Sequence, residues 1–468
     1  MVTDALHCNM VKKTAARFTL PTPLDLLARR ALWVLVVCAL VASCSQAPSG
    51  ARGQVLVAWH TLNGLKEQAL LNLVDEWNRT NPYNITVVPE RHDPTTLNSS
   101  VQQGIAQRAL PALMLVSTVQ AASYYRQGIL TPLDRFITDS SGGNYPGSGW
   151  DASDRADLYP FILTAGVTSN GETVGIPFGG IVRLVYYNRD WLKPIGLDNS
   201  PATWDQFNTA CGSATDRTKG TLCFGVDPSA TTFEQWLLAF GGQVTTDNLN
   251  VLQIATPAAL DAMNHLSDYV RSNQAYRVTT SSQSRDDFAS SRVLFMFGWS
   301  DQLGAVSADI KQRGDFDWGV GLLPAIEGRP QTTNLRAPLW VIARTPGVQN
   351  LDREQAAWLF LHWLLDKSQT AQWAAQTGEL PARASALQEL LAMNGSTAGT
   401  ILTPNETTVL KTVAPLARPE PLVSGWACVQ NTLSDAMRLV FDGQPVTDTL
   451  QLAQAKAQAQ LNTDCSPQ

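Results

Sequence analysis

Aromatic side chains beside polar ones are the residues of this sequence best suited to chemistry. Trp59 and His60 stand together at the end of an apolar run, and Trp299 precedes Asp301 by two residues. A flat apolar ring packs against the C–H face of a sugar, whereas imidazole and carboxylate groups hydrogen-bond to its hydroxyls. These residue types are the ones that sugar recognition uses, so Trp59, His60, Trp299 and Asp301 are candidate ligand residues.

Each of these aromatic residues also has a structural interpretation. Trp59, Trp236 and Trp299 either stack on a ligand or pack in the core. Phe233, which precedes Trp236 in the entry to a helix, is a further ligand candidate. His60 either donates to a hydroxyl or is a satisfied structural group. The sequence leaves both interpretations open for these positions. Tryptophans on apolar stripes are predicted to be core, namely Trp77, Trp340, Trp358 and Trp363.

The first 43 residues are predicted to be an export signal. Basic residues precede the apolar run 31–42, which is shorter than the roughly 20 residues that span a bilayer. The sequence Val41-Ala42-Ser43-Cys44 then resembles a lipoprotein cleavage site. We expect lipidation at Cys44, a tether over residues 44–53 and an extracytoplasmic protein anchored to the cell membrane, in the periplasm or on the outer face. The alternative is an ordinary signal peptide or an uncleaved anchor, and translation could also begin at Met10.

The charge balance argues against whole classes of partner. Without the leader, 29 basic and 38 acidic residues remain of the 34 and 40 in the full chain. An acidic chain of this kind disfavours both nucleic-acid binding and a polybasic membrane face. The remaining length, about 425 residues, is enough for two or three domains, and no later run is apolar enough to span a membrane.

Four cysteines remain beyond Cys44, an even number in an exported chain. We predict the disulfides Cys211–Cys223 and Cys428–Cys465, because each is the pairing closest in sequence. Free buried thiols are the alternative. A metal site is not expected, because no CxxC or Cys/His cluster occurs.

Strands alternate with helices in the first part of the chain. Predicted strands cover residues 54–59, 85–88 and 112–116, and predicted helices cover 65–77, 95–109 and a segment that ends at Gly128. This order predicts a parallel sheet, in which ligands lie beyond the carboxyl ends of the strands. The ligand loops would be 59–63, 90–93 and 117–120.

The alternation of strands and helices resumes later in the chain. Strands are predicted at 184–187, 293–297, 318–322 and 339–343, and a helix contains Trp204. The segment 355–375 has the pattern of one long buried helix, and a helix-rich block at 417–460 completes the chain.

Several short sequence segments, in a fixed order, resemble those of the extracellular solute-binding proteins of family 1. The match runs over nearly all of residues 54–460. Its phrases are Ala58-Trp59-His60, VDEWNRTNP (74–82), QGILTPLD (127–134), GIPF (175–178) with LVYYNRD (184–190), Gly196-Leu197 with PATW (201–204), FGWS (297–300), LWVI (339–342) and QTGELPAR (376–383).

The resemblance implies an α/β, two-lobed fold of the periplasmic-binding-protein type II, with a hinge and a ligand cleft between the lobes. Expected crossings lie near 178–183, 319–324 and 358–366. They give an N-lobe of residues 54–180 and 321–365, and a C-lobe of residues 181–320 and 366–468. The implied function is a monomeric substrate-binding lipoprotein that closes on a carbohydrate and delivers it to the permeases of an ABC importer, without a cofactor.

The resemblance also assigns candidate ligand residues. Polar candidates at matching family positions are Asn63, Thr118, Tyr124, Asp301 and Arg383. Phe178 lies at the first crossing and Arg336 just before a hinge strand, where it binds solute or pairs with an acid between the lobes. Glu379 stands where the glycerol-3-phosphate-binding branch is expected to have an aromatic residue, and its charge would repel phosphate. We therefore expect a neutral sugar or polyol, with glycerol-3-phosphate or a glycerophosphodiester as the alternative.

Other functions have less support in the sequence. The chain has no HExxH, GxSxG or phosphate-binding GxxxxGK[ST] motif, so we do not expect an enzyme. A secreted carbohydrate-active enzyme stays an alternative, because sequence does not set the spacing of carboxylates. A sensor component or an adhesin with the same fold is another.

Overall fold

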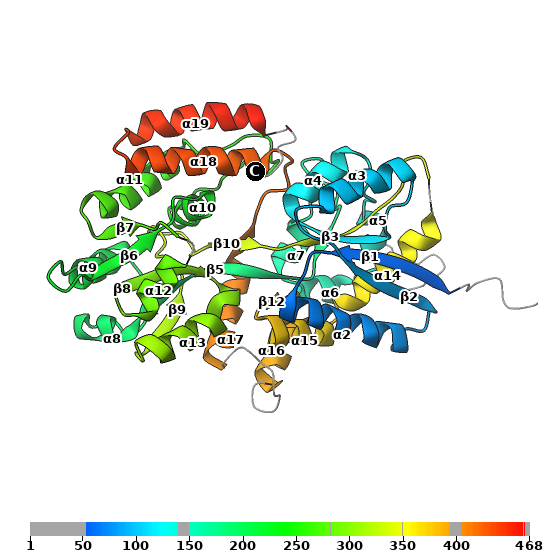
Figure 1. The fold of residues 1–468 in the computed structure, drawn as a ribbon, viewed down its shortest axis with the longest axis horizontal. Coiled ribbons are helices and arrows are strands. Elements are labelled where there is room, and N and C mark those ends of the chain that lie inside the picture. The colour runs from blue at the N-terminus through cyan, green and yellow to red at the C-terminus, as the bar shows by residue number, and fades with distance from the viewer. Residues whose placement is uncertain are drawn as a thin grey trace, which may run out of the picture. The chain divides into compact units, whose positions relative to one another are not determined.

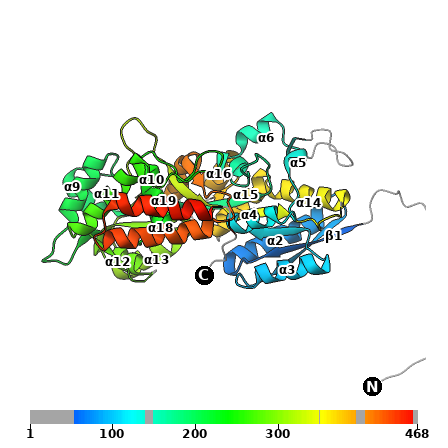
Figure 2. The ribbon, with the colours of Figure 1, turned by 90° about the horizontal axis from the view of Figure 1, so that it is seen from above.

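Two β-sheets organise the residues that the computed structural model describes, which are 53–138, 149–280, 282–348, 350–393, 404–461 and 463. The chain from Gln54 onward forms one unit. The predicted signal peptide, Cys44 and nearly all of the tether lie outside the described residues. The unit from Gln54 onward is shown in Figures 1 and 2.

The smaller sheet has five strands in the order β2-β1-β3-β11-β4. The larger sheet has the order β13-β10-β5-β8-β6-β7, with β12 and β9 also paired to β5. The strands are β1 (Gln54–His60), β2 (Ile85–Arg91), β3 (Leu113–Val116), β4 (Ile176–Pro177), β5 (Gly179–Asn188), β6 (Leu222–Val226), β7 (Ala275–Arg277), β8 (Val293–Trp299), β9 (Trp318–Gly321), β10 (Thr333–Arg336), β11 (Leu339–Ile342), β12 (Leu380–Pro381) and β13 (Ala417–Pro419).

Helices flank both sheets. They are α2 (Gly64–Thr80), α3 (Leu97–Gln107), α4 (Thr118–Arg126), α5 (Asp134–Thr138), α6 (Ala152–Asp157), α7 (Pro160–Thr164), α8 (Arg189–Leu192), α9 (Trp204–Ala214), α10 (Ala230–Ala239), α11 (Pro257–Arg271), α12 (Gln283–Ala289), α13 (Leu303–Arg313), α14 (Leu351–Leu364), α15 (Lys367–Thr377), α16 (Ala384–Met393), α17 (Pro404–Val413), α18 (Trp426–Phe441) and α19 (Val446–Gln460), with short 3-10 turns at Lys193–Ile195, Ser300–Gln302 and Ala414–Leu416. We call the five-stranded sheet and its helices, together with β12, which follows α15, the N-lobe. The rest of the larger sheet and its helices form the C-lobe.

The N-lobe begins with the parallel strands that the sequence predicted. β1 pairs in parallel with both β2 and β3. Its buried positions alternate, with Leu56, Ala58 and His60 inward, because side chains of a strand point to opposite faces. The carboxyl ends of β1, β2 and β3 therefore meet at one edge of the sheet, as a ligand site requires.

β5 joins the two lobes as one continuous strand. Its first residues pair with β12, Val182 pairs with Leu335 of β10, and Arg183 pairs with Trp299 of β8. Gly179 permits this arrangement, because a Cβ there would stand 2.9 Å from the carbonyl oxygen of Leu380. The chain therefore passes from the smaller sheet to the larger one between β4 and β5.

The later crossings differ from the expected positions. β10 belongs to the larger sheet and β11 to the smaller, so the second crossing is at Ala337–Pro338 and not at 319–324. The helices α14 and α15 both pack in the N-lobe, and Figure 2 shows them there. Since α16 packs on α15 and β13 pairs with β10, the third crossing lies between residues 393 and 417. We therefore propose lobe boundaries that follow these sheet memberships.

The long helix predicted over 355–375 is two helices. α14 ends at Leu364 and α15 begins at Lys367, with the backbone of Asp366 extended between them. Asp is favoured just before a helix, and the side chain of Arg383 donates to the carbonyl oxygen of Leu365 that the break leaves free. The apolar pattern continues across the break, which is why periodicity alone missed it.

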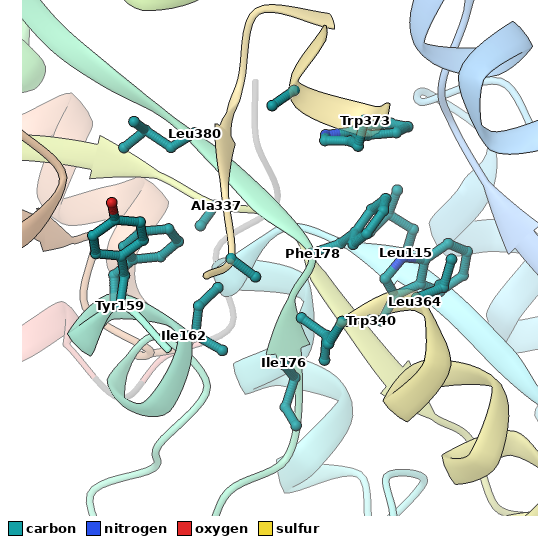
Figure 3. Packing of buried hydrophobic residues seen from close by; sticks show 14 of the residues in the cluster. Leu115, Tyr159, Ile162, Ile176, Phe178, Ala337, Trp340, Leu364, Trp373 and Leu380 are labelled. Carbon is teal, nitrogen blue, oxygen red and sulfur yellow. The ribbon is translucent and has the colours of Figure 1, made fainter. Parts of the chain in front are cut away.

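Tryptophans fill the core at the positions predicted from apolar stripes. Trp77, Trp340 and Trp358 are almost fully buried, and Trp363 packs against the same cluster. Figure 3 shows Trp340 beside Phe178 and Leu364, where the N-lobe core approaches the start of β5. In the C-lobe, α18 and α19 pack on α10 and α11, as Figure 1 shows.

In the described part of the chain, no helix combines the length and the apolar character that a membrane span needs.

The predicted disulfide between Cys211 and Cys223 is confirmed. It ties α9 to β6, and both cysteines are buried in the C-lobe core. The pairing of Cys428 with Cys465 stays a prediction, because Cys465 lies outside the described residues.

Replacing both Cys211 and Cys223 by serine should lower the free energy of unfolding by about 3 kcal/mol, because the bridge closes a loop with a sequence separation of 12. Urea unfolding of the variant and of the wild type measures the difference. Reduction of the wild type should produce at least as large a loss, because it would also break the predicted Cys428–Cys465 bridge. An unchanged urea midpoint in the double variant would contradict the stabilising role.

Candidate functional site

The N-lobe side of the candidate site is an aromatic ring at the carboxyl end of β1. The indole Nε1 of Trp59 donates to Glu90 at 2.9 Å, and the ring packs on His92 with centroids 4.3 Å apart. Trp59 and Glu90 are register partners on β1 and β2, which places these groups side by side. Trp59 is half-buried, so part of its apolar surface stays accessible.

The C-lobe side is built around Trp299 at the end of β8. The guanidinium carbon of Arg336 lies 4.5 Å from the Trp299 ring centroid, and that of Arg183 lies 5.5 Å from it. Such cation–π contacts hold the guanidinium groups in place. Trp299 is 9% exposed, so its ring supports the two arginines and offers little open surface of its own.

The two arginines repel each other across this ring. Burial lowers the pKa of Arg183 to about 10, the charge of Arg336 adds to the fall, and Asp227 opposes it. Arg183 also donates from Nε to Gln235 at 3.4 Å. Two close guanidinium groups favour a ligand that offers hydrogen-bond acceptors.

Arg336 has two further partners in the C-lobe. It donates to the hydroxyl of Thr231 at 2.9 Å and forms an ion pair with Glu420 at 3.3 Å. Thr231 lies in the first turn of α10, whose start is capped by the side chain of Ser229. The Arg336 side chain keeps 44% of its surface exposed, so donors remain for a ligand.

Lys66 links the two lobes beside these aromatic groups. Its amino group contacts Glu379 of the N-lobe at 2.7 Å and Asp301 of the C-lobe at 3.3 Å. Burial alone lowers the pKa of Lys66, but the two carboxylates outweigh it and the net shift is upward. The contact brings the segment after β1 next to the segment after β8.

Glu379 is fully engaged within the protein. Besides Lys66, its carboxylate accepts from the Trp373 indole at 2.9 Å, and it is 6% exposed. Trp373 packs on Phe178 with centroids 4.9 Å apart, as Figure 3 shows. Lys66 neutralises the carboxylate of Glu379. The repulsion of a phosphate ligand that the sequence predicted is therefore not expected.

Several predicted ligand residues lie elsewhere. Phe233 and Trp236 are buried in the C-lobe core among other aromatic rings. Tyr124 is buried in a second N-lobe cluster, where its hydroxyl donates to Asn98 at 3.4 Å. The core interpretation fits these three side chains.

The other polar candidates are scattered. Asn63 is exposed at the start of α2, without a capping hydrogen bond from its side chain, and Thr118 is buried in the first turn of α4. His60 is 1% exposed, and burial lowers its pKa, which favours the neutral ring. Arg383 is 5% exposed and pairs with Asp154 at 3.0 Å. Lys66 thus brings Asp301 and Glu379 together, and Arg336 lies over the ring of Trp299, two residues before Asp301.

Sequence reasoning missed other residues of this site. Lys66 stands in a segment that reads as an amphipathic helix, and Arg183 precedes an apolar strand. Thr231 and Glu420 belong to segments without a motif. Of the residues that the sequence did not single out, only His92 lies in a loop predicted to bind ligand, the loop 90–93. Across the described residues, no group of three or more His, Cys, Asp or Glu could hold a metal ion.

A buried acid, Glu234, lies next to the Arg336 network. Burial raises the pKa of Glu234 to about 8, the Glu420 carboxylate adds to the rise, and Arg336 and Asn334 oppose it. Burial likewise raises the pKa of Glu420, against the attraction of Arg336. Protonation of Glu234 at neutral pH avoids a second buried negative charge.

Comparison with protein families finds one match that covers most of the chain. The model of the bacterial extracellular solute-binding protein family matches residues 72–397. A putative binding protein of Brucella abortus is 23% identical over 354 residues, which cover 75% of this chain and 79% of the relative. The sn-glycerol-3-phosphate-binding periplasmic protein UgpB of Salmonella typhimurium is 25% identical over 351 residues, which cover 70% of this chain and 74% of the relative.

Solved structures show the same fold. The cyclic alpha-maltosyl-1,6-maltose binding protein of Arthrobacter globiformis superposes with a TM-score of 0.72 at 20% identity, covering 87% of this chain and 99% of that one. The sugar-binding protein MalE of Xanthomonas citri gives a TM-score of 0.73 at 17% identity, covering 87% and 97%. These likenesses confirm the predicted two-lobed fold of the periplasmic-binding-protein kind.

The free energy of unfolding should fall as pH rises from about 5 to 8, in part through Glu234. The unfolded chain loses this proton near pH 4 to 5, whereas the folded protein keeps it until about pH 8, so the folded state binds more protons across that window. Glu234→Gln should show a smaller fall of melting temperature between pH 5 and pH 8.5 than the wild type. Equal falls in both proteins would refute the buried, protonated state of Glu234.

Proposed function

Because this chain belongs to the family of bacterial extracellular solute-binding proteins, we propose that it captures a carbohydrate or polyol and delivers it to an ABC importer. The observation that supports this most directly is the Lys66–Asp301 contact, which joins the segments that hold Trp59 and Trp299. We infer from this contact that an apolar ring, guanidinium donors and carboxylate acceptors share one interlobe site. A sugar needs all three kinds of group.

Each group has a separate role in the proposed site. Trp59 packs one face on His92 and offers its remaining surface to the C–H face of a sugar ring. Arg336, held by Trp299 and Thr231, donates to hydroxyl or ring oxygens. Glu90 accepts from Trp59 and has a second oxygen for a solute hydroxyl.

Capture works through closure of the two lobes. A solute that contacts Trp59 in one lobe and Arg336 in the other stabilises the closed form, because it gains both sets of contacts only there. The lobes bend where β5 passes from its β12 partner to its β8 partner. The closed protein then docks on the permeases, without catalysis or a cofactor.

A second candidate ligand is glycerol-3-phosphate or a glycerophosphodiester. The pair Arg183 and Arg336 favours it, because two adjacent guanidinium groups suit a phosphate. The similarity to UgpB, whose name states glycerol-3-phosphate binding, agrees with this candidate. The engagement of Glu379 by Lys66 removes the objection raised from the sequence.

The membrane tether belongs to the same proposal. The apolar run 31–42 followed by Cys44 supports cleavage before Cys44 and lipidation of its thiol. A monomer anchored in this way stays near the permeases. Globomycin, which blocks lipoprotein signal peptidase, should then cause the uncleaved precursor to accumulate.

Trp59→Ala should weaken solute binding by about tenfold or more, because it removes the accessible aromatic surface. Titration calorimetry with maltose, maltotetraose and sn-glycerol-3-phosphate, using the chain from residue 54 onward, first identifies the ligand and then measures the loss. Trp191→Ala is the matched control, since Trp191 is also half-buried but lies at α8 in the C-lobe. An equal loss in both variants would point to general damage and against the Trp59 assignment.

Asp301→Asn should weaken binding of the same solute by up to about fivefold, because it removes one interlobe ion pair of Lys66 that is partly exposed. Small-angle scattering should show a larger radius of gyration for the variant at subsaturating ligand. The matched control is Asp309→Asn, whose partner Arg285 lies in the same lobe. Tighter binding in Asp301→Asn would show that the ion pair opposes closure.

A further inference from the structure

A cavity between the lobes lies apart from the site of Trp59 and Trp299. It has a volume of about 810 Å³, and none of the ligand residues predicted from the sequence lines it. The N-lobe supplies α7 with the residues up to Thr168, and the C-lobe supplies the end of α10, the loop 241–247 and Leu249. The segment 415–422, which leads from the third crossing into the C-lobe, completes the wall.

Two buried oxygen atoms in this wall lack hydrogen-bond partners within the described part of the chain. They are Oε1 of Glu234, a residue 4% exposed, and Oδ1 of Asn334, a residue 3% exposed. A buried acceptor without a partner costs about 1–3 kcal/mol, so such atoms are rare unless something binds them. Once Glu234 is ionised, both atoms can accept a hydrogen bond from a donor outside the protein.

The charges around these atoms specify the kind of donor. Three acids line the cavity, Glu234, Asp247 and Glu420, against two exposed arginines, Arg329 and Arg418. Glu420 already accepts from Arg336 and from Gln430. Glu234 has no ion-pair partner among the described residues, so a cation can use its carboxylate.

The rest of the wall combines threonine and glutamine side chains with stiff apolar segments. It contains five prolines, at positions 160, 330, 415, 419 and 421, and the side chains of Phe161 and Leu238. Proline fixes the backbone, which limits the entropy that binding costs. An apolar body with a single charged donor suits such a cavity.

We propose that this cavity is a second ligand site, which binds a small organic cation whose protonated amine donates to Glu234 and Asn334. The amine occupies the two orphan acceptors, and its apolar part packs against Phe161, Leu238 and the prolines. The site adjoins the carbohydrate site through Glu420, which lines the cavity and pairs with Arg336, but Trp59 and Trp299 do not line it. Its ligand contacts both lobes and so favours the conformation in which they enclose it.

Three molecules of similar shape test the charge that the cavity selects, namely benzylamine, benzyl alcohol and benzoate. On the chain from residue 54 onward, benzylamine should raise the melting temperature in a saturable way and the other two should not. Calorimetry in buffers of different ionisation enthalpy should show release of up to one proton per benzylamine bound at pH 7, because binding ionises Glu234. An equal shift by benzyl alcohol, or no shift by any of the three, would overturn the proposal.

Two glutamine variants locate the binding. Glu234→Gln should abolish both the benzylamine shift and the proton release. Glu354→Gln, which removes a similarly buried carboxylate on α14 of the N-lobe, should keep both. Trp59→Ala should also keep both, which separates this site from the carbohydrate site. Benzylamine binding that persists in Glu234→Gln, or that disappears in Trp59→Ala, would place the amine elsewhere.

Discussion

The structure depends on one strand that must satisfy its backbone in both lobes. β5 pairs with β12 at Gly180, with β10 at Val182 and with β8 from Arg183 onward. Because buried backbone groups need partners, neither lobe can slide along this strand without breaking a ladder. The remaining freedom is bending at the change of partners. Side chains pin that point, since Ser300 accepts from the Val182 amide and Thr333 donates to the Arg183 carbonyl oxygen.

Charge placement in the site follows from the same crossing. Arg183 lies on β5 and Arg336 on β10, close to the point where the strands exchange partners. Buried charges are costly without partners. Trp299 and Glu420 are partners of Arg336, and Gln235 is a partner of Arg183. Lys66 is balanced likewise by two carboxylates. The site is therefore a network in which most charges already have partners, and a solute replaces water on the exposed ones.

The sequence predicted most of what repeats or alternates. The first strands and helices, the core tryptophans on apolar stripes and the Cys211–Cys223 bridge follow from local patterns, and the two-lobed fold follows from the family resemblance. The break at Asp366 was not predicted, because the apolar pattern continues through it. The second crossing was not predicted either, because β10 has no strand pattern of its own and is defined by its pairing with β5 and β13. The sequence left Trp236 and Trp299 open to the same two interpretations, yet only Trp299 ends a strand that pairs with β5. Partners far away in the chain, such as Asp301 for Lys66, have no local signal.

The two tryptophans of the site show why residue type alone does not assign a role. Trp59 is half-buried and packs on His92, so it has surface left for a solute. Trp299 is nearly buried, and Arg336 lies over its ring. A guanidinium group fixed on an aromatic face loses less freedom when it hydrogen-bonds, which makes it a more selective donor. Trp299 thus acts on the solute through the arginine that it positions, whereas Trp59 acts by direct contact.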